Sequence, residues 1–301
     1  MKIERLRVNR LENPVGYDLM KPTVSYVVRD AKGRRQTSAR IVVAYDEEFK
    51  DIVYDSGDKD DIVSTAFELP FETKSETRYY WKVSVKDDAN DSAESDTAYF
   101  ETAKGDAWDA DWISVKGDNK VQAVMYKEIE VKKPVKKARI YMTGLGLYEL
   151  NINGEKQGDE RLLPGFFVYD SYLQYQTFDV SFKEGKNLIE VLMGDGWYKG
   201  NYGLVKRYEN YGDRLALIAE IKLFYEDGTT EKILTDTSWR ARNGHIMESG
   251  IYSGEVIDMT ADVTKQYETE VIDIDKSLLI PRLSPAIKVI NKIKPVELIH
   301  T

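Results

Sequence analysis

The sequence has no cysteine and only two histidines, His245 and His300, among its 301 residues. Without cysteine, disulfides and zinc–thiolate sites are excluded. Two histidines leave almost nothing from which to build a histidine-rich metal centre or a Ser-His-Asp triad. Carboxylates, hydroxyls and aromatic rings are the side chains that remain available for a functional site.

Basic residues are outnumbered by acidic ones. The net charge is −9, with 43 Lys and Arg against 52 Asp and Glu. Nucleic acids and anionic membranes both require a basic surface, so we expect neither as a partner. No run approaches the roughly 20 apolar residues of a membrane span, and residues 1–7 lack the apolar core of a signal peptide. The sequence therefore predicts a cytoplasmic protein.

The first 100 residues lack a convincing helical period and instead contain short strand-like runs. In the clearest run Tyr79, Trp81 and Val83 alternate with polar residues, which is the pattern of a half-buried strand. Six or so strands at this spacing predict an Ig-like or fibronectin III-like sandwich. The runs that we assign as strands are residues 22–28, 39–45, 62–69, 78–86 and 98–102.

One motif sharpens the prediction for this first region. Leu69-Pro70 is followed by Thr77-x-Tyr79-x-Trp81-x-Val83, which resembles the tyrosine corner that opens strand F of fibronectin type III domains. We expect the Tyr79 hydroxyl to bond back to the preceding turn. Trp81 is expected to fill the core, so it is not a binding platform.

A small, polar linker at residues 103–107 marks the best domain boundary. We predict a first domain at 1–104 and a second, jelly-roll domain at 105–262, because the second region is again rich in strand patterns. Asn153-Gly154 is a strong signal for a type I′ hairpin turn. The strands are expected at residues 121–131, 136–143, 148–152, 172–180, 187–193, 214–225, 231–235 and 238–242.

The pattern weakens after Asp258. Residues 261–280 show no clean period, whereas residues 287–299 resemble one or two strands. We expect residues 263–301 to be a linker and the start of a truncated third β domain. A chain that ends within such a pattern is expected to be a fragment of a longer protein.

The loop at residues 194–203 combines four glycines with an acid and several aromatic rings. It carries Asp195, Trp197, Tyr198 and Tyr202. Glycines permit unusual backbone conformations, and aromatic plates beside a carboxylate suit a sugar ring with its apolar face and hydroxyl edge. These four residues are our candidate carbohydrate-binding site. The alternative is that Trp197 and Tyr198 cap the end of the sandwich.

An ordered series of short motifs runs through the second region. It comprises Trp108-x-Ala110-x-Trp112-Ile113, Ala138-x-Ile140-Tyr141, Gly144-x-Gly146-x-Tyr148-x-Leu150-x-Ile152-Asn153-Gly154, Pro164-Gly165, Tyr169-Asp170, Tyr175-x-Thr177-x-Asp179-Val180, Gly194-Asp195-Gly196-Trp197-Tyr198-x-Gly200, Tyr211-Gly212, Asp227-Gly228, Thr235-Asp236-x-Ser238-Trp239 and Ile251-Tyr252-x-Gly254-Glu255-x-x-Asp258. The series resembles the N-terminal β-sandwich domain of bacterial α-L-rhamnosidases, glycoside hydrolase family 78. The first region, with Tyr79-Tyr80-Trp81-x-Val83 and Phe100-Glu101-Thr102, is similar to the module ahead of it.

The resemblance implies that catalysis lies elsewhere. Such enzymes hydrolyse terminal α-L-rhamnose with inversion, using two carboxylates in an (α/α)6 barrel that follows these β domains. No paired amphipathic helices occur here. Two of the loop acids could in principle form an inverting pair; the candidates are Asp195, Asp213, Glu255 and Asp258. In a chain with 52 acids, however, some fall in loops by chance. We therefore expect no catalytic residues, and a non-catalytic region that acts with C-terminal catalytic domains missing from this chain.

A calcium site is also implied by the resemblance. In some of these enzymes the second domain is similar to a rhamnose-binding module, in which calcium bridges loop acids and sugar hydroxyls. Asp159 and Glu160 occupy the corresponding position, and calcium prefers such oxygen ligands. Glu160 departs from the expected amide, and a solvated turn is the alternative.

Two functions remain open at this stage. The jelly roll is either a scaffold or a rhamnose-binding module of an α-L-rhamnosidase, with rhamnose-containing glycosides as partners. The alternative is a free-standing, lectin-like carbohydrate-binding module, which a signal peptide or anchor would favour.

Overall fold

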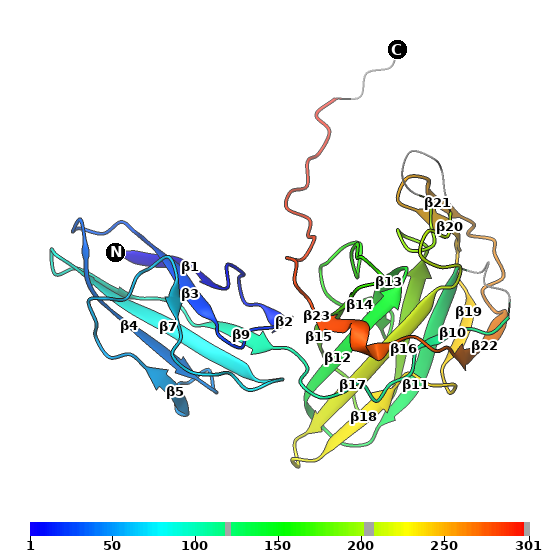
Figure 1. Cartoon of the computed structure of the whole chain (residues 1–301), viewed down its shortest axis with the longest axis horizontal. Helices are drawn as coiled ribbons and strands as arrows, with labels where there is room; N and C mark the ends of the chain where they lie inside the picture. Colours follow the sequence, from blue (N-terminus) through cyan, green and yellow to red (C-terminus); the bar gives the residue numbers. More distant parts are fainter. Residues whose placement is uncertain (118–121, 202–207, 298–301) are drawn as a thin grey trace. The chain divides into compact units, whose positions relative to one another are not determined.

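The computed structural model describes residues 1–117, 122–201 and 208–297. Within these residues the chain forms strands and a single 3-10 turn, η1 (Lys276–Leu278). It divides into two compact units, the first made of Met1–Ala107 with Pro281–Leu283 and the second of Trp108–Ile280 with the residues from Ser284 onward (Figure 1). The predicted all-β class is confirmed. No helix in the described part is long and apolar enough to cross a membrane.

The first unit is a two-sheet sandwich of the immunoglobulin kind. One sheet has the strand order β1-β3-β6, and the other has the order β2-β9-β7-β4-β5 with β8 beside β7. The strands are β1 (Lys2–Val8), β2 (Val15–Tyr17), β3 (Thr23–Arg29), β4 (Gln36–Ala44), β5 (Ile52–Asp55), β6 (Phe67–Glu68), β7 (Arg78–Asp87), β8 (Ser92–Glu94) and β9 (Ala98–Thr102).

The tyrosine corner is present where the sequence predicts it. The backbone N–H of Lys74 donates a 2.7 Å hydrogen bond to the Tyr79 hydroxyl oxygen. Trp81 is completely buried in the core of the first unit. The hydroxyl therefore satisfies a turn donor while the neighbouring indole fills the space between the sheets.

The strands of the second unit form one hydrogen-bonded sheet, which is folded over into two layers. Its strands have the order β14-β13-β16-β11-β19-β22-β10-β17-β12-β15-β23, with β18 beside β17. They are β10 (Ile113–Val115), β11 (Ala123–Val131), β12 (Val135–Leu145), β13 (Leu147–Ile152), β14 (Glu155–Lys156), β15 (Leu173–Val180), β16 (Gly185–Gly194), β17 (Ala216–Tyr225), β18 (Thr230–Leu234), β19 (Arg240–Asn243), β22 (Gln266–Val271) and β23 (Leu279–Pro281). A separate hairpin joins β20 (Ile246–Gly250) to β21 (Gly254–Ile257).

The main core of the second unit lies between the two halves of this sheet. Alternate residues of β17 point into it, as the sequence predicts, and they include Leu217, Ile221 and Leu223. Val191 of β16 and Leu150 of β13 meet them from the other half. The Asn153-Gly154 turn is also confirmed, since both residues have positive φ and the flanking residues of β13 and β14 pair. These two features fix the register that positions the candidate site.

Three sequence predictions differ from the structure. Residues 62–69 yield only the two-residue strand β6, although Ile62 is buried in the core. β22 lies beyond the expected boundary at 262, yet it pairs with β10 and β19 in the second unit. Residues 287–297 form no strand among the described residues and have one isolated bridge, between Glu160 and Lys288. β22 shows no local period because its pairing partners are distant in sequence. In the other two segments the apolar pattern is present, but in the described part of the chain no neighbouring strand pairs with it over its predicted length.

Candidate functional site

The loop that follows β16 is shaped by two closely packed glycines. Gly196 has φ of +55°, and a Cβ there would lie 2.5 Å from Leu147 Cγ. A Cβ on Gly194 would lie 2.8 Å from the Ser249 hydroxyl oxygen. Since real side chains do not tolerate such contacts, the glycines allow β13 and the β20 hairpin to approach this loop closely.

Asp195 connects three segments of the second unit. Gln122 Nε2 donates to Asp195 Oδ1 at 2.7 Å, and the backbone N–H of Asp195 donates to the Ser249 hydroxyl at 3.1 Å. Ser249 in turn donates to Gln122 Oε1 at 3.2 Å. The structure therefore gives this carboxylate a role in holding the loop to the β20 hairpin.

Burial governs the protonation of Asp195. Desolvation raises the pKa of this carboxyl above its ordinary value, although the Gln122 hydrogen bond and the nearby Lys199 ammonium oppose the shift. Lys199 Nζ lies 3.9 Å from Asp195 Oδ1. A half-buried acid with these neighbours stabilises the loop without being presented to solvent as a free ligand group.

Tyr198 lies at the end of the core. Its ring centroid is 5.1 Å from that of Tyr169, and it packs against the small hydrophobic cluster that also contains Trp112. Its backbone carbonyl accepts a hydrogen bond from Tyr211 N–H at 3.2 Å. Burial raises the pKa of the Tyr198 hydroxyl. These contacts match the cap that the sequence allowed as the alternative for this residue.

Trp197 has a different environment. It is partly exposed, and its ring packs edge-on against Phe166 with centroids 6.0 Å apart and an interplanar angle of 64°. Phe166 is 49% exposed. The two rings thus offer an aromatic surface to a ligand. Tyr202, the fourth candidate, lies outside the described residues.

Phe166 is a residue that the sequence patterns did not single out. It follows Pro164-Gly165 and stands next to Phe167, which is buried. Its ring also contacts those of Tyr169 and Tyr211 edge-on. Two adjacent phenylalanines after a Pro-Gly turn were the only available signal, and that signal does not show which ring faces outward.

Asp159 and Glu160, the predicted calcium ligands, have Lys288 as their neighbour in the structure. Asp159 Oδ1 is 2.9 Å from Lys288 Nζ, and this ammonium holds the pKa of the carboxyl below its usual range. Glu160 forms a backbone bridge with Lys288. No group of three or more His, Asp or Glu in the described part is placed to hold a metal ion. The arrangement gives no support for calcium at this position.

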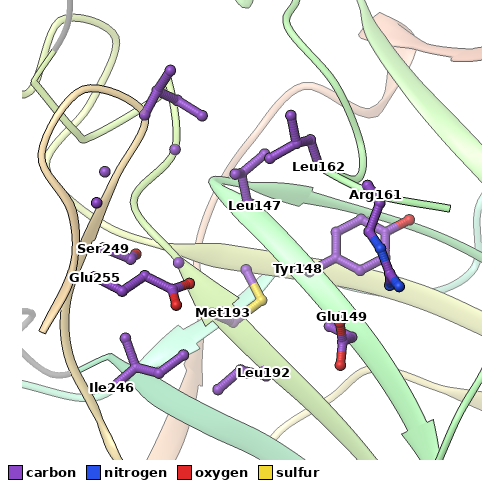
Figure 2. Close-up of a pocket in the computed structure, with 15 residues that line it drawn as sticks. Leu147, Tyr148, Glu149, Arg161, Leu162, Leu192, Met193, Ile246, Ser249 and Glu255 are labelled. Atoms are coloured by element: carbon purple, nitrogen blue, oxygen red, sulfur yellow. The ribbon is translucent and has the colours of Figure 1, made fainter. Parts of the chain in front are cut away.

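A pocket of about 450 Å³ lies beside the candidate loop (Figure 2). Its floor is the outer face of the β13–β16 pair, where Leu147 is opposite Gly194 and Glu149 is opposite Leu192. Figure 2 shows Ile246, Ser249 and Glu255 of the β20–β21 hairpin on one side, with Glu149 and Arg161 on the other. The hairpin therefore forms a wall over a sheet face that otherwise points away from the core.

Most polar residues of the pocket were not predicted. Glu149 pairs with the Lys156 ammonium, and Glu255 is opposite Ser249 in the hairpin. Of the acids considered from the sequence, Glu255 lines the pocket. Asp195 does not line it, but its backbone N–H donates a hydrogen bond to Ser249, which does. Asp258 instead accepts hydrogen bonds from the backbone and hydroxyl of Thr260 in a turn.

Family models match both units of the chain. Residues 133–291 match the model described as alpha-L-rhamnosidase N-terminal domain. Residues 3–106 match the model described as Rha78A-like, N-terminal immunoglobulin domain. The first of these matches alone covers more than half of the chain.

Known proteins give the same assignment. An α-L-rhamnosidase of Streptomyces avermitilis is 42% identical over 128 residues, which is 42% of this chain and 12% of that protein. One of Formosa agariphila is 28% identical over 299 residues, covering 86% of this chain and 31% of that protein. The solved structure of α-L-rhamnosidase from Dictyoglumus thermophilum has a TM-score of 0.79 and 28% identity, covering 99% of this chain and 37% of that one.

The chain thus spans about a third or less of the length of these relatives. Its second unit matches their N-terminal domain, and its first unit matches the immunoglobulin domain ahead of it. The chain belongs to the family of α-L-rhamnosidase N-terminal domains and is an N-terminal part of such enzymes.

Proposed function

We propose that the parent protein is an α-L-rhamnosidase that releases terminal α-L-rhamnose from glycosides, and that this chain is its non-catalytic N-terminal region. The family match and the names of the relatives support the activity. The all-β fold of the described residues supports a non-catalytic role, because the acid and base of such enzymes belong to the helical barrel that the resemblance implies.

We further propose that the second unit binds the rhamnose of the glycoside. The observation that carries this proposal is the partly exposed aromatic pair of Trp197 and Phe166, on segments that also contribute Gly196 and Leu162 to a pocket. A sugar ring has an apolar face of C–H groups that packs on an aromatic plate, and aromatic side chains give large contact areas. Asp195 and Tyr198 act in this proposal by holding the loop, not by contacting the sugar.

A titration with L-rhamnose tests the binding. Trp81, Trp112 and Trp239 are at most 1% exposed, so their fluorescence forms a nearly constant background, whereas Trp108 and Trp197 are both partly exposed. We expect L-rhamnose to change the emission of the wild-type chain, and Trp197→Ala and Phe166→Ala to abolish the response. Tyr252→Ala is the matched control, because it removes a 68% exposed aromatic ring from the same unit.

The titration separates a binding module from a scaffold. If L-rhamnose gives no response in the wild type, the second unit is a scaffold only. If Tyr252→Ala weakens binding as much as Trp197→Ala does, the aromatic pair is not the site.

A further inference from the structure

We propose that the pocket between the β13–β16 pair and the β20–β21 hairpin binds the apolar, aromatic aglycone of a rhamnoside. This inference rests on the proposed function in that the ligand is a rhamnose-containing glycoside. It adds a second subsite whose chemistry differs from that of a sugar site.

The lining of the pocket is the first reason. Most of the side chains that face it are aliphatic: Leu147, Leu162, Leu192, Ile246 and Ile251. Sugar hydroxyls buried against such groups would lose their hydrogen bonds to water without replacement. An aromatic ring instead gains from leaving water. The pocket of about 450 Å³ also has the size of a small-molecule site.

Polar groups stand at two places around this apolar surface. Ser249 and Glu255 lie on the hairpin, while Glu149 and Arg161 lie on the opposite side (Figure 2). A few fixed donors and acceptors around an apolar cavity are typical of sites that orient a small ligand. Phenolic hydroxyls can bond to the carboxylates, and a guanidinium can stack on an aromatic face.

The pocket is held open by the fold itself. A two-stranded hairpin is only marginally stable alone, but the Asp195–Gln122–Ser249 hydrogen bonds tie β20 to the loop after β16. Gly194 and Gly196 have no side chains, so β20 and β13 can pack closely against the loop that follows β16. The walls are therefore positioned before any ligand arrives.

The pocket is continuous along the chain with the aromatic pair. Gly196 lines it and Trp197 follows directly, whereas Leu162 lines it and Phe166 lies four residues later. Both rings of the pair thus stand on segments that also form a pocket wall. In this proposal the rhamnose of a single glycoside lies at these rings and its aglycone lies in the pocket.

Calorimetric titration with three compounds tests the inference: L-rhamnose, 4-nitrophenyl α-L-rhamnoside and 4-nitrophenyl β-D-glucoside. We expect the aryl rhamnoside to bind at least about tenfold more tightly than L-rhamnose, since burying an aromatic ring is strongly favourable. Leu162→Ser and Ile246→Ser should reduce the affinity for the aryl rhamnoside to that for L-rhamnose and leave L-rhamnose binding unchanged. Both positions are partly exposed, so the variants should fold.

Val256→Ser is the matched control. Val256 belongs to the same hairpin and is 52% exposed, but it is not part of the pocket lining. Equal affinities for L-rhamnose and the aryl rhamnoside, or a Val256→Ser effect as large as that of Ile246→Ser, would overturn the aglycone pocket and leave rhamnose binding intact.

The glucoside separates the two proposals. If both aryl glycosides bind equally, L-rhamnose does not bind and Ile246→Ser abolishes both, the pocket is supported and the rhamnose site is wrong. If no compound binds, both proposals are wrong.

Discussion

Two tyrosines, Tyr79 and Tyr198, stabilise the fold in different ways. The Tyr79 hydroxyl accepts a hydrogen bond from the backbone N–H of a turn. The Tyr198 ring instead packs against the small hydrophobic cluster that contains Trp112 and Tyr169. The first role was predicted because the tyrosine corner has a fixed local spacing. The second was left open, since a sequence does not show whether a loop ring turns inward or outward.

Tyr79→Phe should destabilise the first unit by about 1–3 kcal/mol, because it leaves the Lys74 N–H without its acceptor in a partly buried turn. Urea unfolding followed by circular dichroism measures this cost. Tyr80→Phe is the control, since Tyr80 lies on the other face of β7 and is only half-buried. Equal effects of the two substitutions would show that the corner contributes no specific stability.

Asp195→Asn tests the burial of that carboxyl. The pKa is raised in the fold, so stability present below the ordinary carboxyl range is lost as pH rises through the raised value. Asparagine accepts the Gln122 bond without a charge. We expect the melting temperature of the variant, relative to wild type, to rise between about pH 3 and about pH 7.

A melting-temperature difference that stays constant across this range would show that folding does not shift the pKa of Asp195, and a difference that falls would show that the fold favours the ionised form. Either result would contradict the prediction. Asp159→Asn gives the opposite comparison, because Lys288 lowers the pKa of that carboxyl. There the wild type should gain stability relative to the variant as pH rises.

Removing calcium should leave rhamnose binding unchanged. Asp159 faces Lys288, and no group of three or more His, Asp or Glu side chains in the described part of the chain is placed to hold a metal ion. Titrations of L-rhamnose with excess chelator and with added calcium are the measurement. A loss of affinity with the chelator that Asp159→Asn reproduces would restore the calcium site.

At the scale of elements, strands with a local alternation were predicted and strands defined by distant charges were not. β7 and β17 alternate apolar and polar residues or bury one complete face. β22 instead carries Glu268 and Glu270, which pair with Lys116 and Arg214. Its sequence alone resembles a loop, because the basic residues that pair with these two glutamates are over 50 residues away.

The candidate site follows the same rule. The glycine loop and its aromatic residues were visible in sequence because they are contiguous. Gln122, Ser249 and Phe166 come from three other segments, and only folding brings them to the loop. The pocket was not predictable, since it exists only between a sheet face and a separate hairpin.

Gly196→Ala should damage this junction more than a glycine substitution elsewhere. The substitution combines a positive φ, which costs about 1–2 kcal/mol for other residues, with a contact 2.5 Å from Leu147 Cγ. Gly228→Ala is the matched control, because its φ is +83° but no atom lies within 4 Å of the new Cβ. Chemical denaturation should show a clearly larger loss for Gly196→Ala, and equal losses would contradict the close packing of the loop.

At the scale of the whole molecule, two β units without a helical domain constitute an N-terminal part of α-L-rhamnosidases. The chain spans 31% of the Formosa agariphila relative. Of the acids considered as catalysts, Asp195 belongs to a structural hydrogen-bond network, Asp258 lies in a turn and Glu255 lines the pocket. The central claim is that this chain binds a rhamnoside without cleaving it.

The most direct test of that claim is the release of 4-nitrophenol from 4-nitrophenyl α-L-rhamnoside by the purified chain. We predict no release above the uncatalysed rate at concentrations where calorimetry detects binding of the same compound. Glu255 of β21 is the acid considered from the sequence that lines the pocket, so it is the residue to substitute if release is seen. Turnover by the wild type that Glu255→Gln abolishes would contradict the account.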